Sequence, residues 1–311
     1  MSEVLTTLLP SLVSLALALG LALWMLGLLA RTKARFAGRA GAPLMQRYRD
    51  VFKLLGKGAV YSRTTSAIFK ASPIVALATT LVALSMVPLG EVEAAVHFDG
   101  DLFVVAGLLA LGRFITMLAA LDTGSPFEGM GASREAHFGA LLEPVFLISL
   151  LALARLTGAS SLTDMMQALH RMDAASTLPV VVPLVAALGV AYLVENSRMP
   201  VDDPTTHLEL TMIHEVMILD HCGPDLAFIE YAAALKQWLF AALLVGVVLP
   251  IASVPVWASV AVGVAGIAVV TVAVGVVESS MARLRLLNVP GLILGAGAAS
   301  VVAFLLTGMV H

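Results

Sequence analysis

Eight long apolar runs divide the chain, and most charged residues lie in the connections between them. Each run is roughly 17 to 24 residues long, enough for a helix rising about 1.5 Å per residue to cross a hydrocarbon layer of about 30 Å. The pattern therefore predicts an all-α integral membrane protein: a bundle of about eight transmembrane helices with interfacial amphipathic helices. The predicted spans cover residues 8–30, 73–89, 102–121, 138–154, 178–194, 226–249, 257–277 and 289–310.

Two shorter stretches, 44–55 and 162–172, mix apolar and charged positions at helical spacing. In the first, Val51 and Phe52 alternate with Arg47, Arg49 and Lys53. A helix with one apolar and one charged face lies in the membrane interface rather than crossing the bilayer. We therefore predict an interfacial helix for each stretch.

Composition supports the membrane assignment and indicates a single unit. Hydrophobic residues make up 59% of the chain and charged residues 13%, with a mean hydropathy of +0.97. An ordinary soluble domain is far less apolar. No internal repeat or low-complexity linker is evident, so we expect one transmembrane domain over residues 1–311. The missing repeat also argues against a stand-alone transporter of the inverted-repeat class.

Basic residues predict the orientation in the membrane. Ten of the 18 lysines and arginines fall in residues 31–70, whereas the next connection, 90–101, carries four acidic residues and no basic one. By the positive-inside rule, the connections after spans one, three, five and seven face the cytoplasm, and both termini lie outside. The basic segment could also bind anionic lipid head groups or an acidic partner surface.

Ionisable residues inside the apolar runs are candidates for function. Glu143 interrupts span four, and Glu230 and Lys236 interrupt span six; Arg113 lies in span three and Glu195 at the end of span five. Such groups normally face a partner or a water-filled path. Two interpretations of Glu143 remain open: a proton path, or a structural ion pair with Arg113 or Lys236 that holds two helices in register.

The connection after span five concentrates polar side chains, with carboxylates, histidines and an arginine between residues 195 and 221. We expect a helix over residues 206–219 that places four side chains on one face, at separations that suit a proton relay: His207, Thr211, His214 and Glu215. The glycine-bearing connection 122–135 is expected to be an irregular turn rather than a helix.

Metal and cofactor chemistry finds no support in the sequence. His214 and Glu215 begin a zincin-like pattern, but Ile218 occupies the position of the second histidine. Neighbours among His207, His214 and His221 would lie about 10 Å apart on a helix, too far to share one zinc ion. The single cysteine, Cys222, excludes an internal disulfide and a cysteine-ligated cluster. No phosphate-binding or dinucleotide-binding loop is present either.

The polar segments resemble a known family. They are 48–57 (YRDVFKLLGK), 121–135 (LDTGSPFEGMGASRE), 195–215 (ENSRMPVDDPTTHLELTMIHE) and 229–236 (IEYAAALK). Together they are similar to the eight-helix membrane subunit of respiratory complex I, called subunit 1 or H. They are most similar to the membrane-anchor subunit of formate hydrogenlyase (the subunit 4 type) and of energy-converting group 4 nickel–iron hydrogenases.

The resemblance implies a non-catalytic subunit with no redox centre of its own, in a bacterial or archaeal cytoplasmic (inner) membrane. Its expected partners are hydrogenase large and small subunits with a nickel–iron centre and iron–sulfur clusters, a ferredoxin-like iron–sulfur subunit, antiporter-like membrane subunits and membrane lipid, but no nucleic acid. One alternative is the quinone-site subunit of a complex I-type NADH dehydrogenase; a stand-alone ion transporter is the other.

The resemblance and the intramembrane placement together assign two groups of residues. The expected path for protons or sodium ions comprises Glu143, Glu195, Glu209, His214, Glu215, Glu230 and Lys236. Residues expected to dock the peripheral arm or shape the loops are Arg47, Arg49, Asp50, Asp122, Arg134, Arg198 and Asp202. Arg198 and Asp202 are expected to form an ion pair.

Overall fold

The computed structural model describes residues 2–202, 212–249 and 254–309, with side chains from Leu8 onward. Within these ranges the secondary structure is helical apart from one isolated bridge between Leu89 and Val92. Eight helices are long and apolar enough to span a membrane, as the sequence predicts. They are α1 (Ser2–Phe36), α3 (Ala67–Ser85), α4 (Asp101–Asp122), α5 (Pro126–Thr157), α7 (Ala174–Glu195), α9 (Gly223–Val248), α10 (Val256–Ser280) and α11 (Val289–Leu306).

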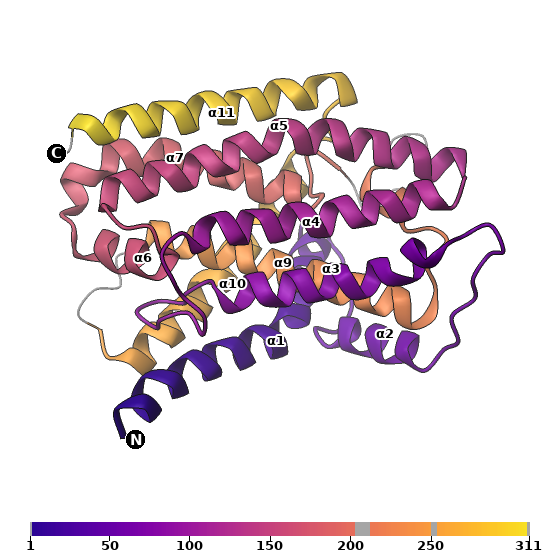
Figure 1. Cartoon of the computed structure of the whole chain (residues 1–311), viewed down its shortest axis with the longest axis horizontal. Helices are drawn as coiled ribbons and strands as arrows, with labels where there is room; N and C mark the ends of the chain where they lie inside the picture. The colour runs from indigo at the N-terminus through magenta and orange to yellow at the C-terminus, as the bar shows by residue number, and fades with distance from the viewer. Residues whose placement is uncertain (1, 203–211, 250–253, 310–311) are drawn as a thin grey trace.

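The long helices lie side by side in one bundle (Figure 1), and the N-terminal end of α1 and the C-terminal end of α11 lie at the same end of it. Two short helices, α2 (Gln46–Leu55) and α6 (Leu162–Arg171), match the stretches predicted to be amphipathic. They lie toward opposite ends of the bundle. The described chain also contains α8 (His214–Met217) and two 3-10 turns, η1 (Leu286–Asn288) and η2 (Thr307–Met309).

Helix α9 forms the centre of the bundle. Its apolar window is 78% buried, whereas the windows of the other seven candidate spans are between 28% and 50% buried. It contacts α1, α2, α3, α7 and α10. Lys236 and Glu230 therefore lie among protein neighbours rather than in lipid, which explains how this span tolerates charge.

The connection 122–135 is not the irregular turn that the sequence suggests, because α5 already begins at Pro126. Proline fits the first turn of a helix, where its missing N–H is not needed. Gly131 packs on this helical turn so closely against Val216 and Ile213 that any side chain would clash. Gly131 thus serves close packing of α5, whereas Gly124, with a positive φ of 71°, lies in the chain reversal, which occupies only residues 123–125.

The continuous helix predicted over residues 206–219 is also wrong in its described part. Met212 and Ile213 are not helical, and the only helix there is the four-residue α8. The Asp202 carboxylate accepts hydrogen bonds from the backbone N–H groups of Ile213 (3.0 Å) and His214 (3.2 Å), which stops the helix at this point. His207, Glu209 and Thr211 lie outside the described residues.

Candidate functional site

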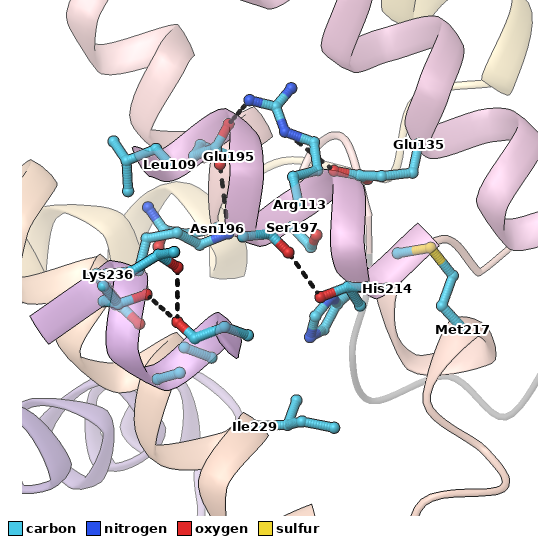
Figure 2. A pocket seen from close by; sticks show the side chains of 18 of the residues that line it. Leu109, Arg113, Glu135, Glu195, Asn196, Ser197, His214, Met217, Ile229 and Lys236 are labelled. Carbon is cyan, nitrogen blue, oxygen red and sulfur yellow. Dashed lines mark hydrogen bonds and ion pairs between the residues drawn. The ribbon is translucent and has the colours of Figure 1, made fainter. Parts of the chain in front are cut away.

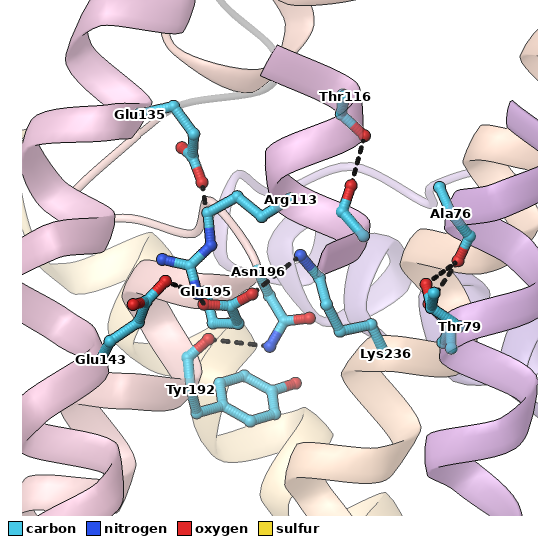
Figure 3. A network of polar contacts seen from close by, with 12 residues as sticks. Ala76, Thr79, Arg113, Thr116, Glu135, Glu143, Tyr192, Glu195, Asn196 and Lys236 are labelled. Carbon is cyan, nitrogen blue, oxygen red and sulfur yellow. Dashed lines mark hydrogen bonds and ion pairs between the residues drawn. The ribbon is translucent and has the colours of Figure 1, made fainter. Parts of the chain in front are cut away.

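Arg113 on α4 is the centre of a buried charged cluster. Its guanidinium lies 3.0 Å from Glu195 Oε2, 3.7 Å from Glu143 Oε1 and 3.8 Å from Glu135 Oε1. Figure 3 shows these three carboxylates, contributed by α5 and α7, around the arginine. One cation is therefore shared among three acids.

Gly139 on α5 makes room for the arginine. A Cβ atom at this position would clash with the Arg113 Nη1 atom, since the two would lie far closer than van der Waals contact. Glycine is otherwise unfavourable inside a helix. Its presence here lets α4 and α5 approach with a guanidinium between them.

Glu195 links the arginine to the central helix. Its second oxygen, Oε1, accepts a hydrogen bond from Lys236 Nζ on α9 at 3.4 Å, and its side chain is only 3% exposed. Arg113 and Lys236 thus hold one carboxylate from opposite sides. The sequence flagged all three residues because each interrupts or ends an apolar run.

Glu143 differs from Glu195 in exposure. Its side chain is 48% exposed, and it lies beside Phe103, Leu142 and Phe146 in a groove of about 240 Å³ on the outer surface of the bundle. The ion pair with Arg113, one of the two interpretations of Glu143, is present. The cluster therefore extends from the interior to the surface of this chain.

A polar cavity adjoins the cluster. Figure 2 shows Arg113, Glu195, Lys236 and His214 facing a common space. A second cavity of about 500 Å³ lies beside it and shares Arg198 and His214 in its lining. Charged side chains from five segments line the second cavity: Lys33, Arg47, Arg198, Asp202, Glu215 and Glu230.

His214 and Glu215, which begin α8, have shifted pKa values. Burial, with help from Lys236 and Arg198, lowers the pKa of His214 to about 4, so its imidazole is neutral at pH 7. Burial, followed by the charges of Glu230 and Asp202, raises the pKa of Glu215 to about 7. Glu215 can therefore gain and lose a proton near neutral pH.

The ion pair predicted between Arg198 and Asp202 is not formed. Asp202 Oδ1 pairs instead with Arg283 Nη2 at 3.0 Å. Arg198 turns toward α9 and α10, where Nη2 donates to Gln237 Oε1 at 2.7 Å and Nη1 lies 3.7 Å from Glu278 Oε1. Asp202 binds the backbone N–H groups at the start of α8 and pairs with Arg283. Arg198 therefore contacts residues inside the bundle instead.

Of the other docking residues, Arg134 donates from Nη1 to the carbonyl oxygen of Met212 (2.9 Å) and so ties α5 to the segment before α8. Asp122 Oδ2 accepts the backbone N–H of Ser66 at 2.6 Å, beside the start of α3. On α2, Arg47 Nη1 lies 3.6 Å from Glu230 Oε2 and Asp50 accepts from Gln46 at 2.9 Å. Arg49 is exposed.

Two acids, the half-buried Glu135 and the buried Glu278, were missed as candidate site residues. Glu135 contacts Arg113, and Glu278 contacts Lys33 at 2.8 Å and Arg198. Both lie just outside the predicted spans 138–154 and 257–277. A charged residue at such a position is interpreted as part of the connection between spans. An acid within one helical turn of an apolar run was the available signal, because the helices extend past the runs.

The described residues hold no group of three or more histidine, cysteine, aspartate or glutamate side chains placed to bind a metal ion. The site consists of ion pairs between membrane helices. The fold and the site together define an eight-helix integral membrane protein with a charged cluster buried in its bundle. The NADH dehydrogenase family profile matches residues 9–308, and the chain belongs to this family.

Relatives confirm the resemblance read from the polar segments. The chain is 31% identical to formate hydrogenlyase subunit 4 of Escherichia coli (strain K12), over 82% of this chain and 83% of that protein. It is 35% identical to hydrogenase-4 component C of the same organism, over 72% and 70%. It is 25% identical to the H-type membrane subunit of the NADH-quinone oxidoreductase of Orientia tsutsugamushi (strain Boryong), over 56% and 49%.

The fold recurs in a solved structure. A chain of the membrane-bound sulfane sulfur reductase, an archaeal respiratory membrane complex, superposes with a TM-score of 0.82 at 20% identity. The alignment covers 98% of this chain and 100% of that chain. This chain therefore shares its fold with a chain of that complex.

Proposed function

We propose that this chain is a non-catalytic membrane subunit of a hydrogenase-type redox complex. The observation that carries the proposal is the buried cluster of Arg113, Glu195 and Lys236, which joins a surface carboxylate to the cavity. The similarity to formate hydrogenlyase subunit 4 and hydrogenase-4 component C supports it. With one cysteine in the sequence, nickel–iron and iron–sulfur chemistry belongs to the large, small and ferredoxin-like partner subunits.

The cluster suits proton coupling because its pairs are interchangeable. Protonating Glu195 weakens its attraction to Arg113 and Lys236. Arg113 then has Glu135 and Glu143 within 4 Å as alternative partners. Protonation of one acid therefore changes the electrostatic interaction of Arg113 with the other two. On the cavity side, the path continues to His214, Glu215 and Glu230, and the expected path includes Glu209.

Glu143 marks where a neighbouring membrane subunit would bind. A half-exposed carboxylate on a membrane helix is costly against lipid and is normally covered by protein or water. We propose that an antiporter-like subunit covers this groove. The peripheral arm would then dock on the cytoplasmic face formed by α2 and the segments around Asp122, Arg134 and Asp202, in a bacterial or archaeal inner membrane with both termini outside.

The second cavity bears on the alternative function, a quinone-site subunit of a complex I-type enzyme. Its volume of about 500 Å³ falls within the range of small-molecule sites, which is about 300 to 1,000 Å³. A quinone site of a complex I-type enzyme would need such a space. Six charged side chains in its wall favour ions and water over an apolar ring.

Gentle solubilisation of the native membrane and isolation of this chain with its partners tests the proposal. Nickel, iron and hydrogen evolution are measured on the same fraction. We expect nickel and hydrogen evolution to copurify with the chain. Iron without nickel, together with quinone-dependent activity, would instead assign the chain to a complex I relative. Isolation without any redox partner would overturn both.

A further inference from the structure

Glu278 is a buried carboxylate that the proposed path does not use. It lies in the last turn of α10, and its side chain is 0% exposed. Its two charged neighbours are both cations: Lys33 Nζ on α1 at 2.8 Å and Arg198 Nη1 after α7 at 3.7 Å. One anion therefore binds two cations from different parts of the chain.

The contact is electrostatic rather than a set of directed hydrogen bonds. Neither Glu278 oxygen makes a hydrogen bond of acceptable geometry with a described residue, and Arg198 Nε also lacks one. The only hydrogen bond from the Arg198 guanidinium to a described residue is to Gln237. An uncharged substitute at position 278 would keep the shape of the side chain but lose what holds Arg198 and Lys33.

Both cations line the 500 Å³ cavity together with Glu215. The charges that act on Glu215 are those of Glu230 on α9, Asp202 and Arg198 after α7, and Arg47 on α2. Lys33 on α1 lines the same cavity. His214 next to it is neutral at pH 7. The positive charge that Glu215 meets thus depends on where Arg198 and Lys33 are held.

We propose that Glu278 is a positioning residue for this cavity: it fixes Lys33 and Arg198 in the wall and sets the balance of charge that Glu215 meets. The inference deepens the proposed proton path, on which its functional meaning rests. Removing the Glu278 charge leaves two cations without their counter-ion and favours ionised Glu215. Removing Lys33 has the opposite effect.

The test is an infrared titration of the Glu215 carboxyl group in the isolated complex, with Glu215→Gln used to assign its band. Glu278→Gln is expected to lower the titration midpoint, because Arg198, which acts on Glu215, loses the anion that partly neutralises it. Lys33→Gln is expected to raise the midpoint. The double variant Lys33→Gln/Glu278→Gln restores the net charge and is expected to titrate close to the wild type.

Asp164→Asn is the matched control, because it removes an exposed acid on α6, toward the other end of the bundle, and should leave the midpoint unchanged. An unchanged midpoint in Glu278→Gln, or a double variant shifted further than either single one, would overturn the inference. If Glu278→Gln alone does not assemble, the charge-balanced double variant is compared with Lys33→Gln. A midpoint that returns toward the wild-type value supports the inference, and a midpoint as high as that of Lys33→Gln overturns it.

The titration does not depend on turnover. The proton path and the positioning role of Glu278 can therefore be rejected independently of each other. Full coupled activity in Glu215→Gln would count against the proton path, while the midpoint shifts could still be measured in the other variants. Loss of activity in Glu215→Gln with no midpoint shift in Glu278→Gln would reject only the role of Glu278.

Discussion

Two buried carboxylates, Asp101 at the start of α4 and Glu195 at the end of α7, illustrate two different uses of burial. Asp101 is 0% exposed; its Oδ1 accepts the backbone N–H of Leu162 at 2.8 Å and its Oδ2 accepts the Ser161 hydroxyl at 2.9 Å. Glu195 is held instead by two charged side chains, Arg113 and Lys236. Burial alone thus does not mark a carboxylate as functional.

The difference lies in the donors. The groups that bind Asp101 are fixed by the start of α6, so its charge serves to join two helices. The same end of the bundle has a second such joint, where His170 contacts Glu91 Oε1 and the carbonyl oxygen of Gly246, each at 2.9 Å. Around Glu195 one of the two donors, Arg113, has two other acids within 4 Å. Charge there can be redistributed, whereas at Asp101 it cannot.

Replacing Arg113 is expected to have the largest effect. Arg113→Met leaves Glu195, Glu135 and Glu143 without their shared cation, and breaking a buried pair by removing one partner costs about 3–5 kcal/mol. We expect little assembled complex in the membrane, measured by native electrophoresis with an antibody to this chain. Arg113→Lys retains the charge and should recover part of the assembly. Normal assembly of Arg113→Met would mean that the acids are neutral.

Asp101→Asn tests whether the buried carboxylate of Asp101 has a structural role only. It weakens two hydrogen bonds to a charged acceptor, and we expect a loss of about 2–3 kcal/mol in stability. The measurement is the thermal unfolding temperature of the isolated complex. Turnover per assembled complex should not change, because the pairs around Glu195 are untouched. A selective loss of turnover would show that this end of the bundle also takes part in coupling.

Glu143→Gln tests whether the cluster around Arg113 conducts protons. The substitution keeps the size of the side chain, removes a titratable group and breaks only one of several pairs to Arg113, so assembly should remain intact. We expect coupled ion movement in proteoliposomes to fall about a hundredfold, at the lower end of the roughly 10²–10⁴-fold that a proton-transfer group contributes. Unchanged coupling would reduce Glu143 to a structural partner of Arg113.

Glu215 gives the smallest effect, a dependence of stability on pH. Its pKa is raised from 4.5 in the unfolded chain to about 7, so the folded state binds more protons between these values. The associated stability is fully present below pH 4.5 and is lost as pH rises through 7. Melting temperatures between pH 4.5 and 8 should fall less steeply in Glu215→Gln; identical slopes would contradict the shifted pKa.

The sequence identified several of these residues as candidates but did not show which residues they contact. Glu195, Lys236 and Glu143 stand out because each interrupts or ends an apolar run, and Arg113 was named as a possible partner of Glu143. Glu278 and Glu135 were not selected because both lie just outside the predicted apolar runs. Whether Arg198 pairs with Asp202 or with Glu278 cannot be read from spacing, since Glu278 is distant in the sequence and reaches Arg198 only through packing of α10.

The membrane class, the eight spans, the two amphipathic helices and the family all follow from the sequence. These depend on local properties: the length of apolar runs, the helical period and short polar segments. Tertiary structure alone decided that α9 is central, that Arg113 serves three acids, and that Glu143 faces outward while Glu195 is enclosed. The physical reason is that an ion pair depends on which helices are neighbours and which faces they turn to one another, and packing of the whole bundle sets both.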